Sequence, residues 1–127
     1  MKKFFFLLML LPALAATDAL NIDTINKAIS SGDADTLGKY FDESVELSIL
    51  DEEDIYSKVE AIAKVKSFFA KNKPSGFSKV HEGTSKGNDS RYSIGNLKAG
   101  GGSFRVYVYT KEAGSGVVIQ ELRFDRE

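Results

Sequence analysis

Glycine divides the second half of the chain into four strand-like segments, and this feature constrains the fold more than any other. The segments run from Phe77 to Lys86, Arg91 to Lys98, Phe104 to Lys111 and Val117 to Asp125. They are separated by Gly87-Asn88-Asp89, Gly100-Gly101-Gly102 and Gly114-Ser115-Gly116. Glycine reaches the positive φ angles that tight hairpin turns require. Because short links force neighbouring strands to run antiparallel, the pattern predicts a four-stranded meander.

The chain before Pro74 has a mainly helical pattern. Ile22, Ile25 and Ile29 fall at helical spacing, and Gly32 is placed to end that helix. Asp33 is a suitable N-cap for a second, short helix, whose apolar face would carry Leu37, Tyr40 and Phe41. The pattern predicts two short amphipathic helices joined by a corner.

A strand pattern and a longer helix follow. Val45, Leu47 and Ile49 alternate with polar residues, which predicts a half-buried strand. We expect the acidic run 51–54 to form the next turn and Ile55-Tyr56 to start a second short strand. Ser57-Lys58-Val59-Glu60 fits a capping box. The helix behind it should end at Asn72 and Pro74, with an apolar stripe of Ala61, Ile62, Val65, Phe68 and Phe69.

The N-terminus has the features of a secretory signal. Lys2 and Lys3 precede an apolar run from Phe4 to Leu11, which is much shorter than the roughly 20 residues that span a bilayer. Ala13-Leu14-Ala15 provides the small residues of a cleavage site. We therefore expect a signal peptide at 1–15, a single mature domain at 16–127, and export to the periplasm or beyond the cell. No stable membrane anchor would remain after cleavage.

Composition excludes several function classes. The 127 residues contain no cysteine, so thiolate chemistry, disulfides and attachment of lipid to cysteine are ruled out. Lysine and arginine number 17 against 18 acidic residues, and removal of Lys2 and Lys3 makes the mature chain slightly more acidic. This balance argues against nucleic acid as a partner. We expect no cofactor.

The order of elements resembles the nuclear-transport-factor-2-like, or cystatin-like cone, superfamily. The resemblance is carried by Ile25 to Ile29, the Gly32-Asp33 joint, Leu37 with Tyr40-Phe41, the Phe68-Phe69 pair and the final Leu122-Arg123-Phe124. The chain is most similar to a family of short secreted bacterial proteins of unknown function with this fold. The resemblance implies an α+β domain in which N-terminal helices pack on a strongly curved antiparallel sheet.

The same resemblance implies the placement of a pocket. The long helix would cross the concave face of the sheet, the last strand would pair with the first, and an apolar pocket would lie between helix and sheet. The candidates for its lining are Tyr40, Tyr56, Phe69 and Tyr92. Because the fold hosts enzymes, binders and assembly modules alike, it does not define an activity.

Catalytic and metal-binding patterns are weak in this sequence. His81 is the only histidine, and its neighbour Glu82 would point to the opposite face of a strand. The acidic run 51–54 lacks the spacing of a calcium loop. Enzymes of the superfamily often use an acidic residue or an Asp–His pair inside the cone, but the positions expected to face inward are mostly apolar: Val45, Leu47, Ile49, Tyr92, Ile94, Phe104, Val106, Val108, Leu122 and Phe124. We therefore assign no catalytic and no metal-binding residue.

One strand suggests an interaction surface. Phe104, Val106 and Val108 alternate with a second set of side chains, which are Arg105, Tyr107 and Tyr109. If the aliphatic set forms the core, the second set faces outward, and tyrosine and arginine are enriched at protein interfaces. Tyrosine also simply fits strands well. We therefore expect a non-catalytic module that binds a small apolar ligand, a protein partner or a second copy. The alternative is a small cone-fold enzyme of the isomerase, dehydratase or hydrolase type.

Overall fold

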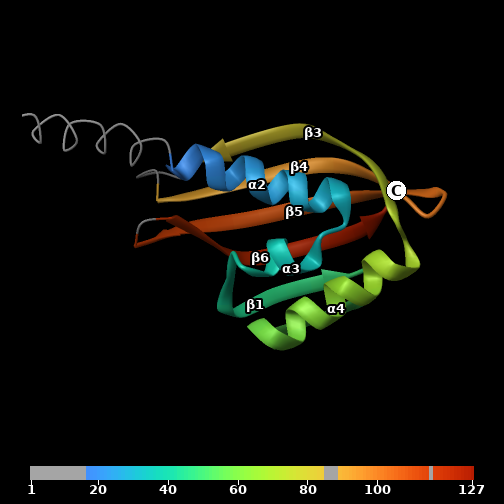
Figure 1. Cartoon of the computed structure of the whole chain (residues 1–127), viewed down its shortest axis with the longest axis horizontal. Coiled ribbons are helices and arrows are strands. Elements are labelled where there is room, and N and C mark those ends of the chain that lie inside the picture. Colours follow the sequence, from blue (N-terminus) through green and yellow to red (C-terminus); the bar gives the residue numbers. More distant parts are fainter. Residues whose placement is uncertain (1–16, 85–88, 115) are drawn as a thin grey trace, which may run out of the picture.

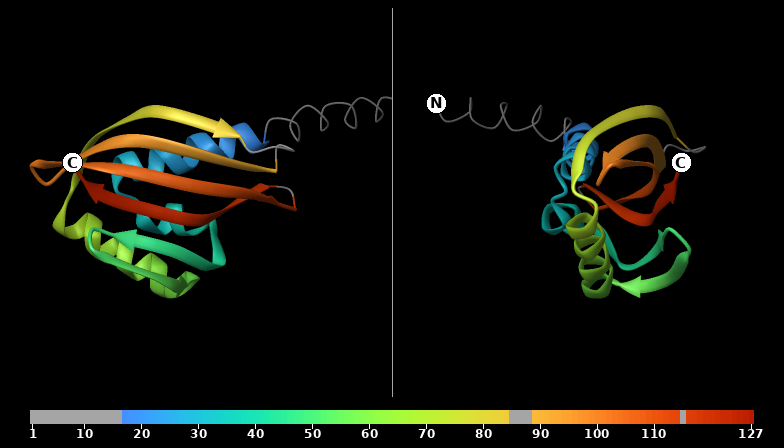
Figure 2. Two further views of the ribbon diagram at one scale, coloured as in Figure 1. Left: turned by 180° about the vertical axis from the view of Figure 1, so that it is seen from behind. Right: turned by 90° about the vertical axis from the view of Figure 1, so that its right-hand side faces the viewer.

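Six strands form one curved sheet, and three helices occupy its open side, within the residues that the computed structural model describes (17–84, 89–114 and 116–127). The sheet has the strand order β2-β1-β6-β5-β4-β3 (Figure 1). Its strong curvature is seen end-on in the right-hand view of Figure 2. This is the predicted α+β architecture of helices on a strongly curved sheet. The predicted signal peptide lies outside the described residues.

The observed elements follow the predicted order. The helices are α2 (Thr17–Ser31), α3 (Ala34–Gly38) and α4 (Lys58–Lys71). The strands are β1 (Phe41–Ile49), β2 (Glu52–Ser57), β3 (Pro74–Thr84), β4 (Ser90–Ala99), β5 (Gly102–Ala113) and β6 (Gly116–Arg126). No helix of the described part of the chain is long and apolar enough to cross a membrane.

Short-range signals set the end of α2 and the starts of α3 and α4 as expected, but α3 is shorter than predicted, because it ends at Gly38 and Phe41 begins β1. Gly32 adopts φ +73° directly after α2, and the Asp33 carboxylate accepts a hydrogen bond from the Thr36 amide at 3.1 Å at the start of α3. At the start of α4, Ser57 Oγ accepts from the Glu60 amide at 3.3 Å and lies 3.2 Å from Glu60 Oε1. The bonds to the Thr36 and Glu60 amides satisfy groups that a helix leaves without internal partners.

The first hairpin differs from the expectation. Ile49 pairs with Glu52, so the turn consists of Leu50 and Asp51 alone, and the acidic residues after it belong to β2. Leu50 carries the positive φ (57°) that a two-residue turn needs. The predicted turn at 51–54 was therefore wrong. Exposed charges along β2 are suited to an edge strand, where they oppose pairing with other chains.

The meander and its closure agree with the expectation. Strands β3 to β6 are joined antiparallel in sequence order, and Gly100 and Gly101 make the tight β4–β5 turn with φ +57° and +80°. The last strand pairs with the first: β6 lies beside β1, and the two run parallel. This pairing brings the helical half and the meander into one sheet.

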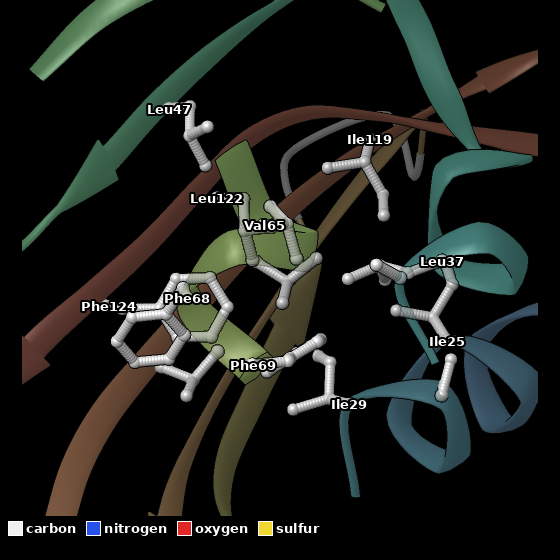
Figure 3. Packing of buried hydrophobic residues seen from close by; sticks show 14 of the residues in the cluster. Ile25, Ile29, Leu37, Leu47, Val65, Phe68, Phe69, Ile119, Leu122 and Phe124 are labelled. Atoms are coloured by element: carbon white, nitrogen blue, oxygen red, sulfur yellow. The ribbon is translucent and has the colours of Figure 1, made fainter. Parts of the chain in front are cut away.

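The core lies between α4, α2 and the inner face of the sheet (Figure 3). The Phe68 ring packs edge-on against Phe104 at 5.1 Å and beside Phe124 at 4.6 Å between ring centroids. Ile25 and Ile29 of α2 are also buried in this cluster. The helices cover different regions of the sheet: the backbone of α4 lies nearest to β1 and β2, and the backbone of α2 lies nearest to β3 and β6.

One strand presents the opposite face from the one expected. In β4 the buried residues are Ser90, Ser93, Gly95, Leu97 and Ala99. Tyr92 and Ile94 pair with Tyr109 and Tyr107, which lie on the outer face. The inward assignment of Tyr92 and Ile94 was therefore wrong. The physical reason is packing: the Phe77 ring of β3 crosses the inner face at Gly95, where a larger side chain would not fit.

Candidate functional site

A cavity of about 320 Å³ opens between the middle of α2 and the strands β3, β4 and β5. Its size falls at the lower end of the range typical of small-molecule sites. The described residues that line it are Ile22, Asp23, Ile25, Asn26, Lys79, Glu82, Gly83, Thr84, Arg91, Tyr92, Ser93, Val108 and Thr110.

Two neighbouring strands change in character along this cavity. On the inner face of β4, Gly95 and Ser93 are buried, whereas Arg91, nearer the start of the strand, is exposed. On β5, buried Val108 pairs with Ser93, and buried Thr110 pairs with Arg91. The cavity therefore passes from an apolar interior to a polar rim. This arrangement suits a ligand with one apolar part and one polar part.

Ser93 is the most informative residue of the lining. Its side chain is only 8% exposed, and its hydroxyl makes no hydrogen bond to any atom of the described residues. Buried polar groups in folded proteins nearly always have a partner, because an unpaired one is costly. A water molecule or another polar molecule inside the cavity can supply this partner.

Charged groups stand at the rim rather than at the floor. Lys79 and Glu82 of β3 form an ion pair at 3.4 Å with each other. Arg91 of β4 and Asp23 of α2 lie on facing elements of the lining, and both are exposed. The net charge of these four groups is balanced, so the rim does not select strongly for one sign of charge.

The four residues predicted to line a pocket have different positions. Tyr40 is half-buried and packs against the core. The Lys64 ammonium lies over the Tyr56 ring, 5.4 Å from the ring centroid. Phe69 is buried in the core beneath α4. Tyr92 borders the cavity, although its ring stacks with Tyr107 on the outer face. The cavity lies beside α2, whereas the resemblance had placed a pocket under the long helix, which large aromatic side chains fill.

The cavity residues Ser93, Thr110 and Arg91 were not identified from the sequence. A usable signal was present in the Gly100-Gly101 turn. A two-residue turn pairs Ala99 with Gly102, and counting back along the hairpin places Ser93 opposite Val108. Because Val108 was already assigned to the inner face, this register would have turned Ser93 inward.

The outer face of the sheet holds the predicted interface residues. Arg105 is exposed, and Tyr107 and Tyr109 are half-buried on the face away from the helices. Burial raises the pKa of the Tyr107 phenol above its ordinary value, and the charges of Glu121 and of ionised Tyr109 and Tyr92 add to this effect. The rings of Tyr92 and Tyr107 stack with centroids 6.3 Å apart.

Further polar contacts extend across this outer face. His81 Nε2 lies 2.8 Å from Tyr92 Oη, within hydrogen-bonding distance. Arg123 of β6 forms ion pairs with Glu53, Glu121 and Asp125 at 3.5–3.9 Å. His81 therefore has an orienting partner that sequence adjacency did not suggest, but it lies on the face opposite the cavity. In the described residues, no three histidine or acidic side chains are grouped as a metal site.

Comparison with known proteins shows a family and a fold. The model of the family described as a domain of unknown function (DUF4783) matches residues 22–125. A solved DUF4783 protein from Bacteroides ovatus is 31% identical with a TM-score of 0.77, and the match covers 82% of this chain and 93% of that one. One from Bacteroides uniformis is 27% identical with a TM-score of 0.78, covering 83% and 95%. No curated protein matches the chain.

More distant structures extend the likeness of the fold. An NTF2-like protein of unknown function from Silicibacter pomeroyi is 14% identical with a TM-score of 0.63, and the match covers 86% of this chain and 92% of that one. At this identity the likeness concerns the fold alone. The matched family model and the curved sheet with its helices together show that the chain belongs to the DUF4783 family and has a nuclear-transport-factor-2-like fold.

Proposed function

We propose that this protein is a non-catalytic binding module whose ligand site is the cavity between α2 and strands β3–β5. The observation that carries the proposal is the buried, unpaired Ser93 hydroxyl beside a cavity of about 320 Å³. Ile25 and Val108 supply apolar walls, and such walls with a few placed polar groups are typical of small-molecule sites. The ligand is a small amphipathic molecule.

The alternative of a cone-fold enzyme has weaker support. Acid–base chemistry requires a carboxyl or imidazole group held next to the reacting atom, often with a shifted pKa. Here the acidic side chains of the lining are Asp23 and Glu82, which are exposed at the rim, and Glu82 is paired with Lys79. The His81–Tyr92 pair lies on the other face of the sheet. Binding without chemical conversion therefore fits the cavity better.

A fluorescent apolar probe tests the proposal. 1-Anilinonaphthalene-8-sulfonate added to the folded mature domain should bind, with amide NMR shifts concentrated at Ser93, Val108 and Thr110. Val108→Phe places a ring in the cavity and should weaken probe binding at least tenfold. Ile22→Trp, at a half-buried position on the rim, should do the same with less risk to folding. Val80→Phe is the matched control, because Val80 is exposed and outside the lining.

Two results would contradict the binding site. Probe binding that persists in both folded cavity variants would show that the probe binds elsewhere. NMR shifts restricted to the outer tyrosines would give the same answer. Circular dichroism on each variant establishes that the fold is retained before affinities are compared.

A second candidate function is self-association through the outer face. One patch there carries hydroxyl donors on Tyr92, Tyr107 and Tyr109 beside the carboxylates of Glu121 and Asp125. A twofold-related copy can therefore pair donors of one patch with acceptors of the other, as isologous contacts require. The stacked Tyr92 and Tyr107 rings give this patch apolar area as well.

Sedimentation tests this second candidate. The parent should sediment as a dimer, and Tyr107→Ser/Tyr109→Ser should sediment as a folded monomer. A parent that is monomeric at high concentration would refute the dimer. A double variant that unfolds would show that these side chains stabilise the domain itself, and Arg105→Ala, at an exposed position of the same strand, then serves as the milder probe.

We also propose that the domain works after export, because residues 1–15 have the pattern of a cleavable signal. Intact mass of the exported protein should place the mature N-terminus at Ala16 or Thr17. A mass that includes Met1 would exclude cleavage.

A further inference from the structure

We propose that the ligand carries a hydroxyl group, held inside the cavity by Ser93 and Thr110, with its apolar part against Ile25 and Val108. This inference rests on the proposed function and narrows the class of ligand. Two hydroxyl side chains are buried on the inner face of the sheet. Ser93 is 8% exposed and Thr110 is 2% exposed, and both line the cavity.

The two hydroxyls differ in the hydrogen bonds that they can still form with a ligand. Thr110 Oγ1 donates a hydrogen bond to the Arg91 carbonyl at 3.3 Å. It can therefore only accept a further hydrogen bond, through its lone pairs. Ser93 Oγ makes no hydrogen bond with the described residues, so it can donate and accept. A ligand group that donates a hydrogen bond to Thr110 Oγ1 and accepts one from Ser93 Oγ would satisfy the hydrogen-bonding capacity of both hydroxyls. A hydroxyl is the smallest group with both capacities.

The register of the sheet places these hydroxyls within reach of one ligand atom. Ser93 pairs with Val108 and Arg91 pairs with Thr110, so Ser93 and Thr110 are diagonal neighbours on adjacent strands. Diagonal neighbours on one face of a sheet lie about 7–8 Å apart. Because both residues line the same cavity, an oxygen placed between the two side chains can contact both.

The surrounding walls define the rest of the ligand. Ile25 and Val108 are buried apolar residues on opposite sides of the cavity, from α2 and β5. The charged groups lie outward of Ser93, at the rim. A wholly apolar ligand would leave the Ser93 hydroxyl buried without a partner, and sites of this kind discriminate strongly against molecules that lack the matching polar group.

A matched pair of probes tests this inference. 2-Naphthol and naphthalene share one ring system and differ by a hydroxyl, and both can be titrated into the mature domain while amide NMR shifts of Ser93 and Val108 are followed. An apolar cavity would prefer naphthalene, which is the more hydrophobic of the two. The inference predicts the opposite order, with 2-naphthol binding at least tenfold more tightly.

Variants assign the preference to Ser93. Ser93→Ala should reduce the ratio of the two affinities below threefold, mainly by weakening 2-naphthol. Ser78→Ala is the matched control, because Ser78 is an exposed serine of β3 outside the lining, and it should leave the ratio unchanged. Circular dichroism verifies that both variants are folded.

The outcomes separate this inference from the proposed function. If both probes bind in the cavity with equal affinity, or naphthalene binds more tightly, the hydroxyl inference is overturned and the cavity remains a binding site. If neither probe shifts the cavity amides of the folded protein, the proposed function itself fails. A preference for 2-naphthol that survives Ser93→Ala unchanged would also overturn the role of Ser93.

Discussion

The Phe77 ring occupies the space that a side chain at Gly95, on the neighbouring strand, would need. A β-carbon added at Gly95 would lie 2.6 Å from Phe77 Cε1 and 2.8 Å from the Ser78 carbonyl oxygen. The next inward-facing residue of β4 is Ser93, where the cavity is. The cavity therefore begins beyond the ring that fills the inner face at Gly95.

This contact makes Gly95 sensitive to substitution. Gly95→Ala should lower the free energy of unfolding by about 1–3 kcal/mol, the usual cost of overpacking a filled site. Urea denaturation measures the change. Gly76→Ala is the control, because nothing lies within 4 Å of a β-carbon at Gly76. An unchanged denaturation midpoint for Gly95→Ala would mean that Phe77 moves aside without cost.

The packing of α4 gives a second prediction. The Phe69 ring is 5% exposed and packs edge-on to Phe124 with centroids 5.8 Å apart. Phe69→Ala should lower the free energy of unfolding by about 3–5 kcal/mol. Val59→Ala on the same helix, at a position that is 78% exposed, should change it by less than about 0.5 kcal/mol. Thermal and urea unfolding should agree, and similar values for the two variants would contradict the assigned helix face.

Ser93 offers a test of stability that does not need a ligand. Removing its hydroxyl breaks no hydrogen bond to the described residues, so Ser93→Ala should leave the free energy of unfolding unchanged or raise it by about 1 kcal/mol. The comparison is Thr110→Val, which removes the 3.3 Å hydrogen bond to the Arg91 carbonyl and should be destabilising. A clear loss of stability in Ser93→Ala would show that its hydroxyl has a structural partner.

Tyr107 should be visible in an alkaline titration. Burial raises the pKa of its phenol above 10.0 in the folded protein. A raised folded-state pKa contributes stability that is complete below the unfolded value and is lost as pH rises through the folded value. The free energy of unfolding should therefore decrease above pH 10, and it should decrease less steeply in the Tyr107→Phe variant. Absorbance at alkaline pH should show one of the five tyrosines ionising late, and that late phase should be missing in Tyr107→Phe.

Much of the fold was predictable because its signals are local. Gly32 ends α2, Ser57 caps α4 and Gly100-Gly101 turns β4 into β5, and each acts through the backbone angles or amide groups of its own neighbourhood. The acidic run after Ile49 was misread because Leu50, a residue that rarely adopts positive φ, makes the turn. Nothing near Leu50 in the sequence signals that conformation.

By itself, the sequence determined the order of helices and strands, their approximate ends and the inner face of β5, since these depend on spacing and turn chemistry. The tertiary structure alone decided which face of β4 is buried and where the cavity lies. The larger apolar residues of β4, Tyr92 and Ile94, favoured the wrong face because hydrophobicity was judged one strand at a time. The true face depends on the pairing with β5 and on the Phe77 ring of β3, and both contacts join residues distant in sequence.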